Sequence, residues 1–358
     1  MKSTKVLIGL VLASSFITQT ANATAGLTLA SSVKQALEET QFTSKEQVYD
    51  ALSSLVVTPY RIDGHKFNKR IYYGASTKEA CDYRKDGYIN FVDLEGGNIT
   101  NVELDFYLPT HKEMLDQPTS DTHQQITKAA EAANEQCFDV VLAPVVDYGY
   151  GDRNLYQPEN TRPELATEHL NTIMEAYAAN GLVSTLKHYP VSAWTPPEPD
   201  YKSQFGKTLK SPEQLHNGYV ESAPVSLTDD EWFSDFDMVN EMVEDAIYES
   251  DQSKTMVMLS NYAIKEYGFQ PYVYTDAPKN DDLLNDFEGL TITDDLYQLV
   301  VNKENSLKAF ENSDLFIITS YKDLKAFMNF VTDEAFKDPK VLKMIASKQK
   351  KVDAFFTE

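Results

Sequence analysis

Two adjacent aspartates, Asp294 and Asp295, stand directly after a short run of apolar and β-branched residues at 290–293. A run without polar alternation is typical of a strand that is covered on both faces, as in a parallel sheet. Acids contribute little to packing at the end of such a strand, whereas ligands of parallel α/β folds bind at the carboxyl ends of strands. The pair therefore predicts a binding or catalytic site at this point of the chain.

Other charged side chains follow predicted strands in the same way. They are Asp93 and Glu95, Asp147 with Arg153 in the loop just beyond it, and Lys187 with His188. In a barrel all of these strand ends lie on one face. Carboxylates accept hydrogen bonds from hydroxyl groups, Lys and Arg donate to them, and a free carboxylate can attack an anomeric carbon. The set therefore suits a polyhydroxy ligand such as a sugar.

The elements that must position these residues alternate between strand and helix. We expect strands at 55–57, 88–92, 138–146, 182–186, 255–259, 290–293 and 315–319, and helices at 44–55, 122–136, 163–180, 235–250, 304–312, 324–331 and 341–355. About seven or eight strands with crossovers of helical length predict an α/β fold with a parallel sheet and, at this size, a (β/α)8 TIM-type barrel. An open doubly wound sheet is the alternative, but no G-x-G-x-x-G follows an early strand.

The N-terminus has the pattern of a secretory signal at residues 1–25. Lys2 and Lys5 are basic, the apolar run 6–17 is too short to span a bilayer, and small residues at 21–23 or 23–25 offer a cleavage site. We expect residues 26–358 to form one barrel domain that begins with a loose polar arm at 26–43. The pattern predicts a soluble protein that is periplasmic or secreted.

The chain is strongly acidic, with a formal net charge of -23 over 358 residues. Removing the signal takes away two lysines and no acids, so 30 bases would face 55 acids in the mature chain. Such a protein repels nucleic acid and anionic lipid. We therefore expect no nucleic-acid partner. From the strand-end residues we expect a carbohydrate or glycoside partner. We also expect no membrane span and a monomer.

The two cysteines, Cys81 and Cys137, each lie just upstream of a predicted strand. Export permits a disulfide, and neighbouring strands would bring the two thiols to one end of the sheet. A bridge and two free thiols are both compatible with the sequence.

Five motifs in the same order resemble glycoside hydrolase family 3, most closely its single-domain β-N-acetylglucosaminidase branch, from about residue 87 to 355. The family motif V-D-x-E-G-G-R is matched at 92–97, with Asn98 in place of arginine, and A-P-V-x-D is matched at 143–147. G-x-R is matched at 151–153, the first half of K-H-F-P-G-H-G at 187–190, and T/S-D-D-L at 293–296; a late A-G-x-D-x-x-L element is echoed at 311–317.

The resemblance implies a retaining glycosidase and assigns roles to particular residues. Asp294 matches the catalytic nucleophile, and the sugar is held by residues that match Asp93, Arg153, Lys187 and His188. No metal or organic cofactor is implied, and the six histidines include no close-spaced pair.

The segment after Pro190 departs from the family pattern. The glucosaminidase branch takes its general acid/base from a histidine in a D-S-H segment, and an ungapped count places Glu198, Pro199 and Asp200 there. Asp200, or Glu198, could replace the histidine, because most retaining glycosidases use a carboxyl acid. The departure could equally mark a site that has lost its chemistry. Two functions remain: an exported retaining glycosidase for β-linked N-acetylhexosamine or glucose units, and a sugar-binding pseudoenzyme that acts as a glycan sensor or adaptor.

Overall fold

The computed structural model describes residues 31–59, 67–73, 79–149, 154–156, 163–190, 193–194, 230–261, 263–264, 270–296 and 301–357. The expected signal peptide lies outside these residues. So do Arg153, Glu198 and Asp200.

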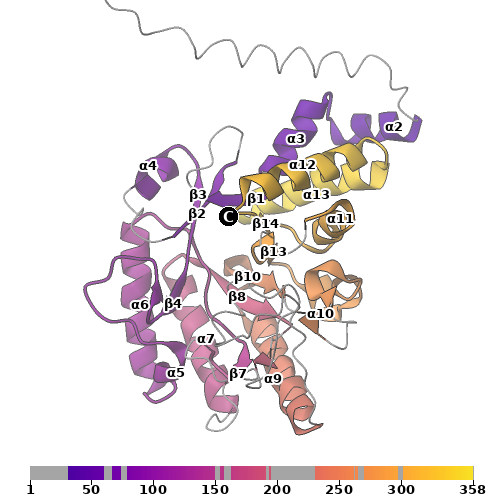
Figure 1. Ribbon diagram of the computed structural model, residues 1–358. Coiled ribbons are helices and arrows are strands. Elements are labelled where there is room, and N and C mark those ends of the chain that lie inside the picture. The colour runs from indigo at the N-terminus through magenta and orange to yellow at the C-terminus, as the bar shows by residue number, and fades with distance from the viewer. Residues whose placement is uncertain are drawn as a thin grey trace, which may run out of the picture.

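Eight parallel strands form the centre of the molecule (Figure 1). In sheet order they are β13 (Leu290–Thr293), β10 (Thr255–Leu259), β8 (Val183–Tyr189), β6 (Val140–Val141), β3 (Ile89–Val92), β2 (Lys69–Tyr72), β1 (Val56–Pro59) and β14 (Phe316–Ile317). The two outer strands also meet: Thr293 N–H donates to Leu315 O and Leu315 N–H to Thr291 O, both at 3.0 Å. The sheet therefore closes on itself, and the predicted TIM-type barrel is confirmed.

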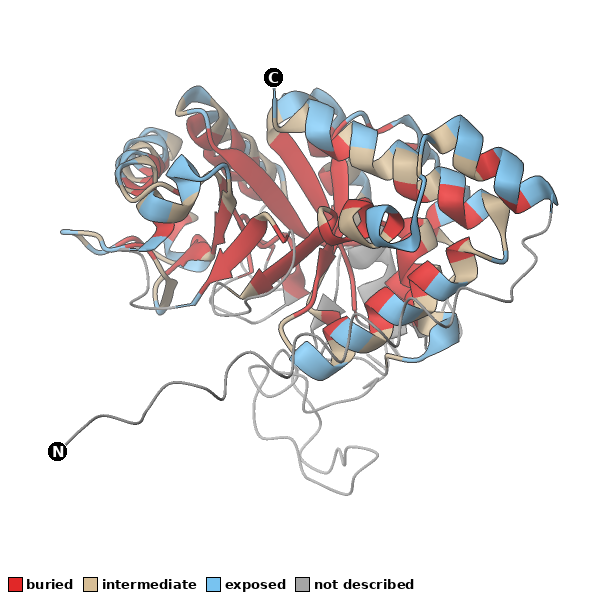
Figure 2. Cartoon of the chain, turned by 90° about the horizontal axis from the view of Figure 1, so that it is seen from above, coloured by how far each residue is buried: buried red, intermediate tan, exposed pale blue. Residues whose placement is uncertain are grey.

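Helices surround the strands, as the view in Figure 2 shows, with buried strands inside and helices whose outer faces are exposed. Every residue of β8, β10 and β13 is buried, which explains the continuous apolar patterning of the last two. The longer helices are α2 (Ser31–Thr40), α3 (Lys45–Ser53), α6 (Thr119–Glu135), α7 (Pro163–Ala179), α9 (Asp230–Glu249), α11 (Lys303–Asn312), α12 (Tyr321–Ala335) and α13 (Pro339–Phe355).

Short sequence patterns correctly predict where several helices begin or end. Ser44 caps α3 by accepting a hydrogen bond from the backbone N–H of Gln47 at 3.2 Å, as the capping pattern predicts. Helix α7 begins at Pro163, and Gly181 follows its end with a positive φ of 76°. Proline suits the first turn of a helix and glycine the left-handed position after its end.

Four expectations are wrong in detail. Strand β2 was not predicted, because its sequence Lys-Arg-Ile-Tyr carries two cations, although all four residues are buried. The strand expected at 138–146 is a continuous strand only at 140–141 in β6, with one isolated parallel bridge between Val145 and Lys187. Strand β8 extends through Lys187 and His188, which therefore lie within the strand and not after it. The arm expected at 26–43 contains helix α2, which buries Val33 and Ala36.

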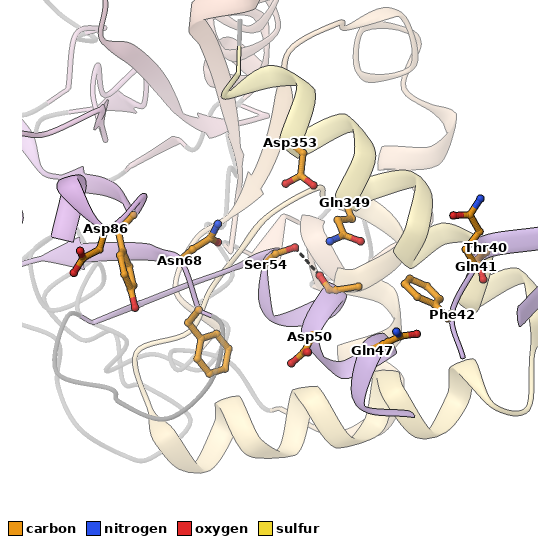
Figure 3. A pocket seen from close by; sticks show the side chains of 13 residues that line it. Thr40, Gln41, Phe42, Gln47, Asp50, Ser54, Asn68, Asp86, Gln349 and Asp353 are labelled. Carbon is orange, nitrogen blue, oxygen red and sulfur yellow. Dashed lines mark hydrogen bonds between the residues drawn. The ribbon is translucent and has the colours of Figure 1, made fainter. Parts of the chain in front are cut away.

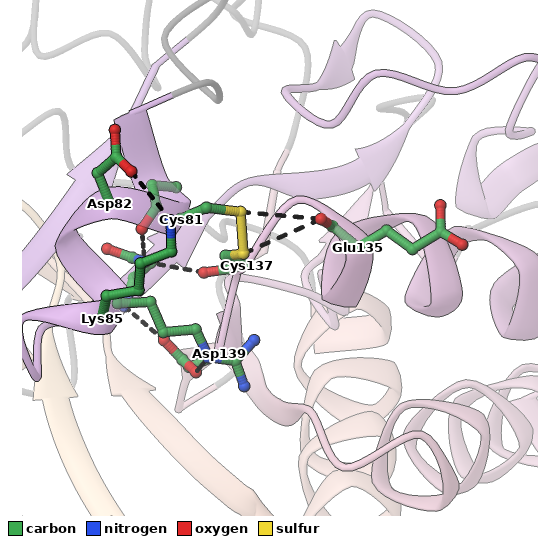
Figure 4. The surroundings of a disulfide bond; sticks show 9 residues. Cys81, Asp82, Lys85, Glu135, Cys137 and Asp139 are labelled. Atoms are coloured by element: carbon green, nitrogen blue, oxygen red, sulfur yellow. Dashed lines mark hydrogen bonds and ion pairs between the residues drawn. A yellow bond between two sulfur atoms is a disulfide. The ribbon is translucent and has the colours of Figure 1, made fainter.

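A disulfide joins Cys81, on helix α4 (Ala80–Lys85), to Cys137, which follows α6 (Figure 4). The two Cα atoms are 4.9 Å apart. Because the cysteines precede the neighbouring strands β3 and β6, the bridge ties the N-terminal ends of those strands together. Of the two alternatives that the sequence left open, the structure has the bridge.

Within the described ranges, no helix combines the length and apolar character that crossing a bilayer requires.

Candidate active site

A buried lysine joins two carboxylates at the C-terminal mouth of the barrel. The Nζ atom of Lys187, near the end of β8, is 2.6 Å from Glu95 Oε1 and 3.2 Å from Asp93 Oδ1. The side chains of Lys187 and Glu95 are 5% and 1% exposed, whereas that of Asp93 is 15% exposed. Buried charges are tolerated when they compensate one another. The lysine thus compensates buried negative charge and leaves the edge of Asp93 open toward solvent.

The neighbouring His188 is held by a third carboxylate, Asp147, which follows β6. Asp147 Oδ2 accepts from the ring Nδ1–H at 2.9 Å, and its Oδ1 accepts from the backbone N–H of His188 at 3.3 Å. Both side chains are almost fully buried. This double contact fixes the orientation of the imidazole and leaves Nε2 directed toward the mouth of the barrel.

Asp294, which follows β13, lies on the other side of Nε2. Its Oδ2 is 3.7 Å from His188 Nε2, and its Oδ1 accepts from the backbone N–H of Asp295 at 2.7 Å. A distance of 3.7 Å is longer than a hydrogen bond, so Oδ2 retains lone pairs for a reacting atom or a ligand. The side chain is 15% exposed, which makes this oxygen accessible from the mouth.

The adjacent Asp295 has a different environment. Its carboxylate accepts from the backbone N–H of Thr319, at 3.1 Å, and from the Thr319 hydroxyl group. It therefore ties the end of β13 to the segment after β14. Of the two acids in the motif, Asp294 faces the mouth and Asp295 supports the barrel seam.

The structure thus brings together four of the site residues predicted from sequence: Asp93, Lys187, His188 and Asp294. They come from three strands, and the parallel pairing places all of their ends on one face. The other predicted residues, Arg153, Glu198 and Asp200, lie outside the described part of the chain.

Two further acids hold the predicted residues in place. Glu95 pairs with Lys187 and Asp147 pairs with His188. Both were recognised as strand-end acids, but neither was assigned a role. A buried cation needs a compensating acid, and this requirement was the signal that could have identified them.

Tyr73 was missed because strand β2 was missed. The pairing of Tyr72 with Val92 places Tyr73 level with Asp93 on the neighbouring strand. Tyr73 is 47% exposed, yet desolvation, followed by the carboxylates of Asp93, Asp295 and Asp294, raises the pKa of its hydroxyl well above the usual value. The phenol therefore lies at the mouth as a hydrogen-bond donor that stays protonated.

The arrangement can bind hydroxyl groups from several sides and present one carboxylate to a reacting carbon. Among the described residues, no three His, Cys, Asp or Glu side chains gather as metal ligands. The carboxylates, the imidazole and the ammonium group at the mouth are suited to acid, base and nucleophile chemistry.

A second hollow, of about 660 Å³, lies at the opposite end of the barrel (Figure 3). Its lining residues directly precede strands β1, β2 and β3 or belong to α3, α13 and the turn before α3; they include Ser54, Asn68, Tyr88, Gln349 and Asp353. Because the strand-end carboxylates described above lie at the C-terminal mouth, this basal cavity is separate from the candidate site.

Comparison with known proteins assigns the fold. No protein-family model and no curated protein matches the sequence. Among solved structures, the chain is similar to the β-N-acetylglucosaminidase from Thermotoga maritima, with a TM-score of 0.64, 14% identity and coverage of 84% of this chain and 66% of that chain. The barrel has a glycoside hydrolase family 3-like fold.

Two other matches agree in length as well. A glycosyl hydrolase of family GH3 from Mycobacterium smegmatis gives a TM-score of 0.63 at 15% identity, covering 86% of this chain and 97% of that chain. The β-N-acetylhexosaminidase from Beutenbergia cavernae gives 0.64 at 16% identity, with coverage of 87% and 98%. The chain therefore spans about two thirds of the Thermotoga maritima protein but nearly all of the other two.

Proposed function

We propose that the protein is an exported glycoside hydrolase, periplasmic or secreted, that cleaves β-linked N-acetylhexosamine or glucose units with retention of configuration. One observation carries the proposal. The carboxylate of Asp294 is oriented by the Asp295 N–H, and its second oxygen lies 3.7 Å from His188 Nε2, beyond hydrogen-bond distance. It lies beside buried charges that suit the hydroxyl groups of a sugar.

In the proposed mechanism Asp294 attacks the anomeric carbon. The bond from that carbon to the leaving oxygen breaks, and the leaving oxygen takes a proton from a general acid. Water then hydrolyses the glycosyl ester as the same acid, now a base, accepts the proton of the water. Asp200 is the first candidate for this group and Glu198 the second.

The remaining site residues would hold the sugar before the scissile bond. Asp93 accepts from sugar hydroxyls, Lys187 and Arg153 donate to them, and His188 Nε2, whose ring carries its proton on Nδ1, accepts from them. Glu95 and Asp147 act through Lys187 and His188 and are positioning residues.

A sugar-binding pseudoenzyme is the second candidate function. The observation in its favour is the sequence after Pro190, which departs from the family motif and lacks the acid/base histidine. The charges around Lys187 and His188 do not depend on that segment, so sugar binding would survive the loss of the acid.

A panel of 2-fluoro glycosyl inhibitors tests the proposal. We expect a mass increase that maps to Asp294, and none in Asp294→Asn. The sugar that labels the enzyme would also identify the substrate class. Wild-type protein that binds sugar, is not labelled and does not turn over aryl glycosides would establish the pseudoenzyme.

Two variants distinguish the candidate acids. Asp200→Ala should slow natural glycosides by about 10²–10⁴-fold, but aryl glycosides with acidic phenols less, and azide should rescue deglycosylation. If Glu198→Ala shows this pattern instead, the role belongs to Glu198. The acid should lie about 5–5.5 Å from Asp294 in a retaining enzyme.

A further inference from the structure

The hydroxyl group of Tyr189, the residue directly after His188, lies between two carboxylates. It is 3.0 Å from Glu244 Oε1 on α9 and 2.9 Å from Asp281 Oδ2, which precedes helix α10 (Asp282–Asp286). The tyrosine is buried at the end of β8. One side chain therefore connects the strand that carries His188 to two outer elements of the barrel.

The number of protons at this junction is limited. A tyrosine hydroxyl carries one proton and can donate to only one of the two carboxyl oxygens. The tyrosine oxygen is also at hydrogen-bond distance from the carboxyl oxygen to which it does not donate. This second contact needs a proton of its own, since two lone pairs would otherwise face each other. One of the two carboxyl groups must therefore be protonated.

Asp281 is satisfied as a carboxylate. Its Oδ2 also accepts from the hydroxyl of Tyr272 at 2.6 Å, and its Oδ1 accepts from the backbone N–H of Leu284 at 3.1 Å. Both oxygens of Asp281 therefore have donors.

Glu244 has the opposite surroundings. Besides the contact with Tyr189, its Oε1 accepts from the neutral amide of Asn240 at 2.6 Å. Burial raises the pKa of Glu244, the contacts with Tyr189 and Asn240 lower it in part, and the charges of Asp281 and Glu241 raise it further. Burial, followed by Asp281 and Glu244, also raises the pKa of Tyr189, so the phenol keeps its proton.

We propose that Glu244 is a positioning residue whose protonated carboxyl donates to the Tyr189 hydroxyl and holds the end of β8 against α9. Ionisation of Glu244 as the pH rises breaks this contact beside His188. The effect on turnover rests on the proposed glycosidase function, but the proton and the contact do not.

Among the described residues, the titratable groups around Glu244 are acids and tyrosines. Tyr189 and Asp281 face it directly, Tyr272 acts through Asp281, and Glu241 and Tyr248 lie one turn away on α9. Helix α7 also packs against α9, and none of the groups that act most strongly on Glu244 belongs to it. With no cation in this set, the pKa of Glu244 stays raised.

The sign of the pH effect follows from the raised pKa. The folded protein binds this proton more tightly than the unfolded chain does. The stabilisation is therefore complete below the ordinary glutamate pKa and is lost as the pH rises through the raised value. Each unit of increase corresponds to about a tenfold change in the unfolding equilibrium constant.

Glu244→Gln and Glu241→Gln form a matched pair for the test. Both remove one acid from α9, but only Glu244 contacts Tyr189. As the pH is raised from the ordinary glutamate pKa, the infrared C=O stretch of a protonated carboxyl should persist to a higher pH in wild type and Glu241→Gln than in Glu244→Gln. Denaturant unfolding should show a loss of stability as the pH rises above the ordinary glutamate pKa in wild type and Glu241→Gln but not in Glu244→Gln, because the amide donates at every pH. The proposed proton between Glu244 and Tyr189 would be ruled out if the infrared band were unchanged in Glu244→Gln and if Glu244→Gln and Glu241→Gln had the same stability.

Turnover tests the positioning role separately. In an active enzyme, Glu244→Gln should flatten the alkaline limb of the pH profile of kcat/KM, and Glu241→Gln should not. An active Glu244→Gln enzyme with the wild-type profile would overturn the positioning role. If the infrared and stability results hold but wild-type protein turns over no glycoside, the shared proton stands and the proposed function fails.

Discussion

Lys187 and Lys69 are both buried lysines, and they lie at opposite ends of the barrel. Lys187, near the end of β8, pairs with the carboxylates of Asp93 and Glu95. Lys69, at the start of β2, donates to two neutral acceptors, the backbone oxygen of Ser54 at 2.6 Å and Asn68 Oδ1 at 3.2 Å.

The partners of the two lysines show that Lys187 belongs to the candidate active site and that Lys69 makes a structural contact. Burial lowers the pKa of Lys69 to about 8, and the charge of Asp353 offsets this only in part. Lys187, by contrast, has two carboxylates within ion-pair distance, and one of them reaches the surface of the mouth. Both ends of the barrel contain acids, but among the described residues the mouth gathers ion-paired charges around a partly exposed carboxylate. That combination distinguishes the candidate active site from the basal cavity.

The largest expected effect is on turnover. Asp294→Asn should abolish turnover of activated and natural glycosides, because no covalent intermediate can form. Asp353→Asn, at the basal cavity, should leave kcat/KM unchanged. Steady-state kinetics on both variants checks the contrast, and a loss of turnover in Asp353→Asn would contradict it.

Replacing each lysine by methionine should separate the two ends by stability. Lys187→Met removes the cation that lies within ion-pair distance of Asp93 and Glu95 and should cost about 3–5 kcal/mol. Lys69→Met removes a charge that has only neutral partners, so its cost near pH 7 should be much smaller. Denaturant unfolding measures both variants. Equal losses would show that the partners of the two lysines do not matter.

The pH dependence of unfolding should sharpen the same contrast. Because the folded pKa of Lys69 is about 8 and its ordinary value is 10.5, the unfolded chain holds this proton more tightly. Stability should therefore rise as the pH increases through 8 toward 10.5, by on the order of 3 kcal/mol. The measurement is the difference between wild type and Lys69→Met, which cancels the other titrating groups. A difference that stays constant over this range would contradict the lowered pKa.

The smallest effect is expected at the rim of the mouth. Tyr73→Phe removes one hydroxyl donor, which should raise KM by up to about tenfold and leave kcat nearly unchanged. Tyr321→Phe, an exposed tyrosine at the start of α12, is the matched control and should leave both constants unchanged. A fall in kcat with unchanged KM would assign Tyr73 to the chemical step.

The sequence alone determined the features that depend on short-range patterns. The buried strands at 255–259 and 290–293 have no polar alternation, so their place in a parallel sheet is visible without a partner. The cap at Ser44 and the Pro163 start of α7 depend on their own backbone groups. Strand-end acids and cations likewise predicted which face of the barrel would carry the site.

Only the tertiary structure decided the features that depend on a partner distant in sequence. Strand β2 reads as polar, and it is a strand because β1 and β3 pair with it on both sides. The disulfide forms because β3 and β6 are neighbours. Asp294 and Asp295 are adjacent in sequence, but Thr319 engages Asp295 and leaves Asp294 facing His188. These outcomes depend on pairing, burial and charge compensation across the fold, which no local pattern in the sequence contains.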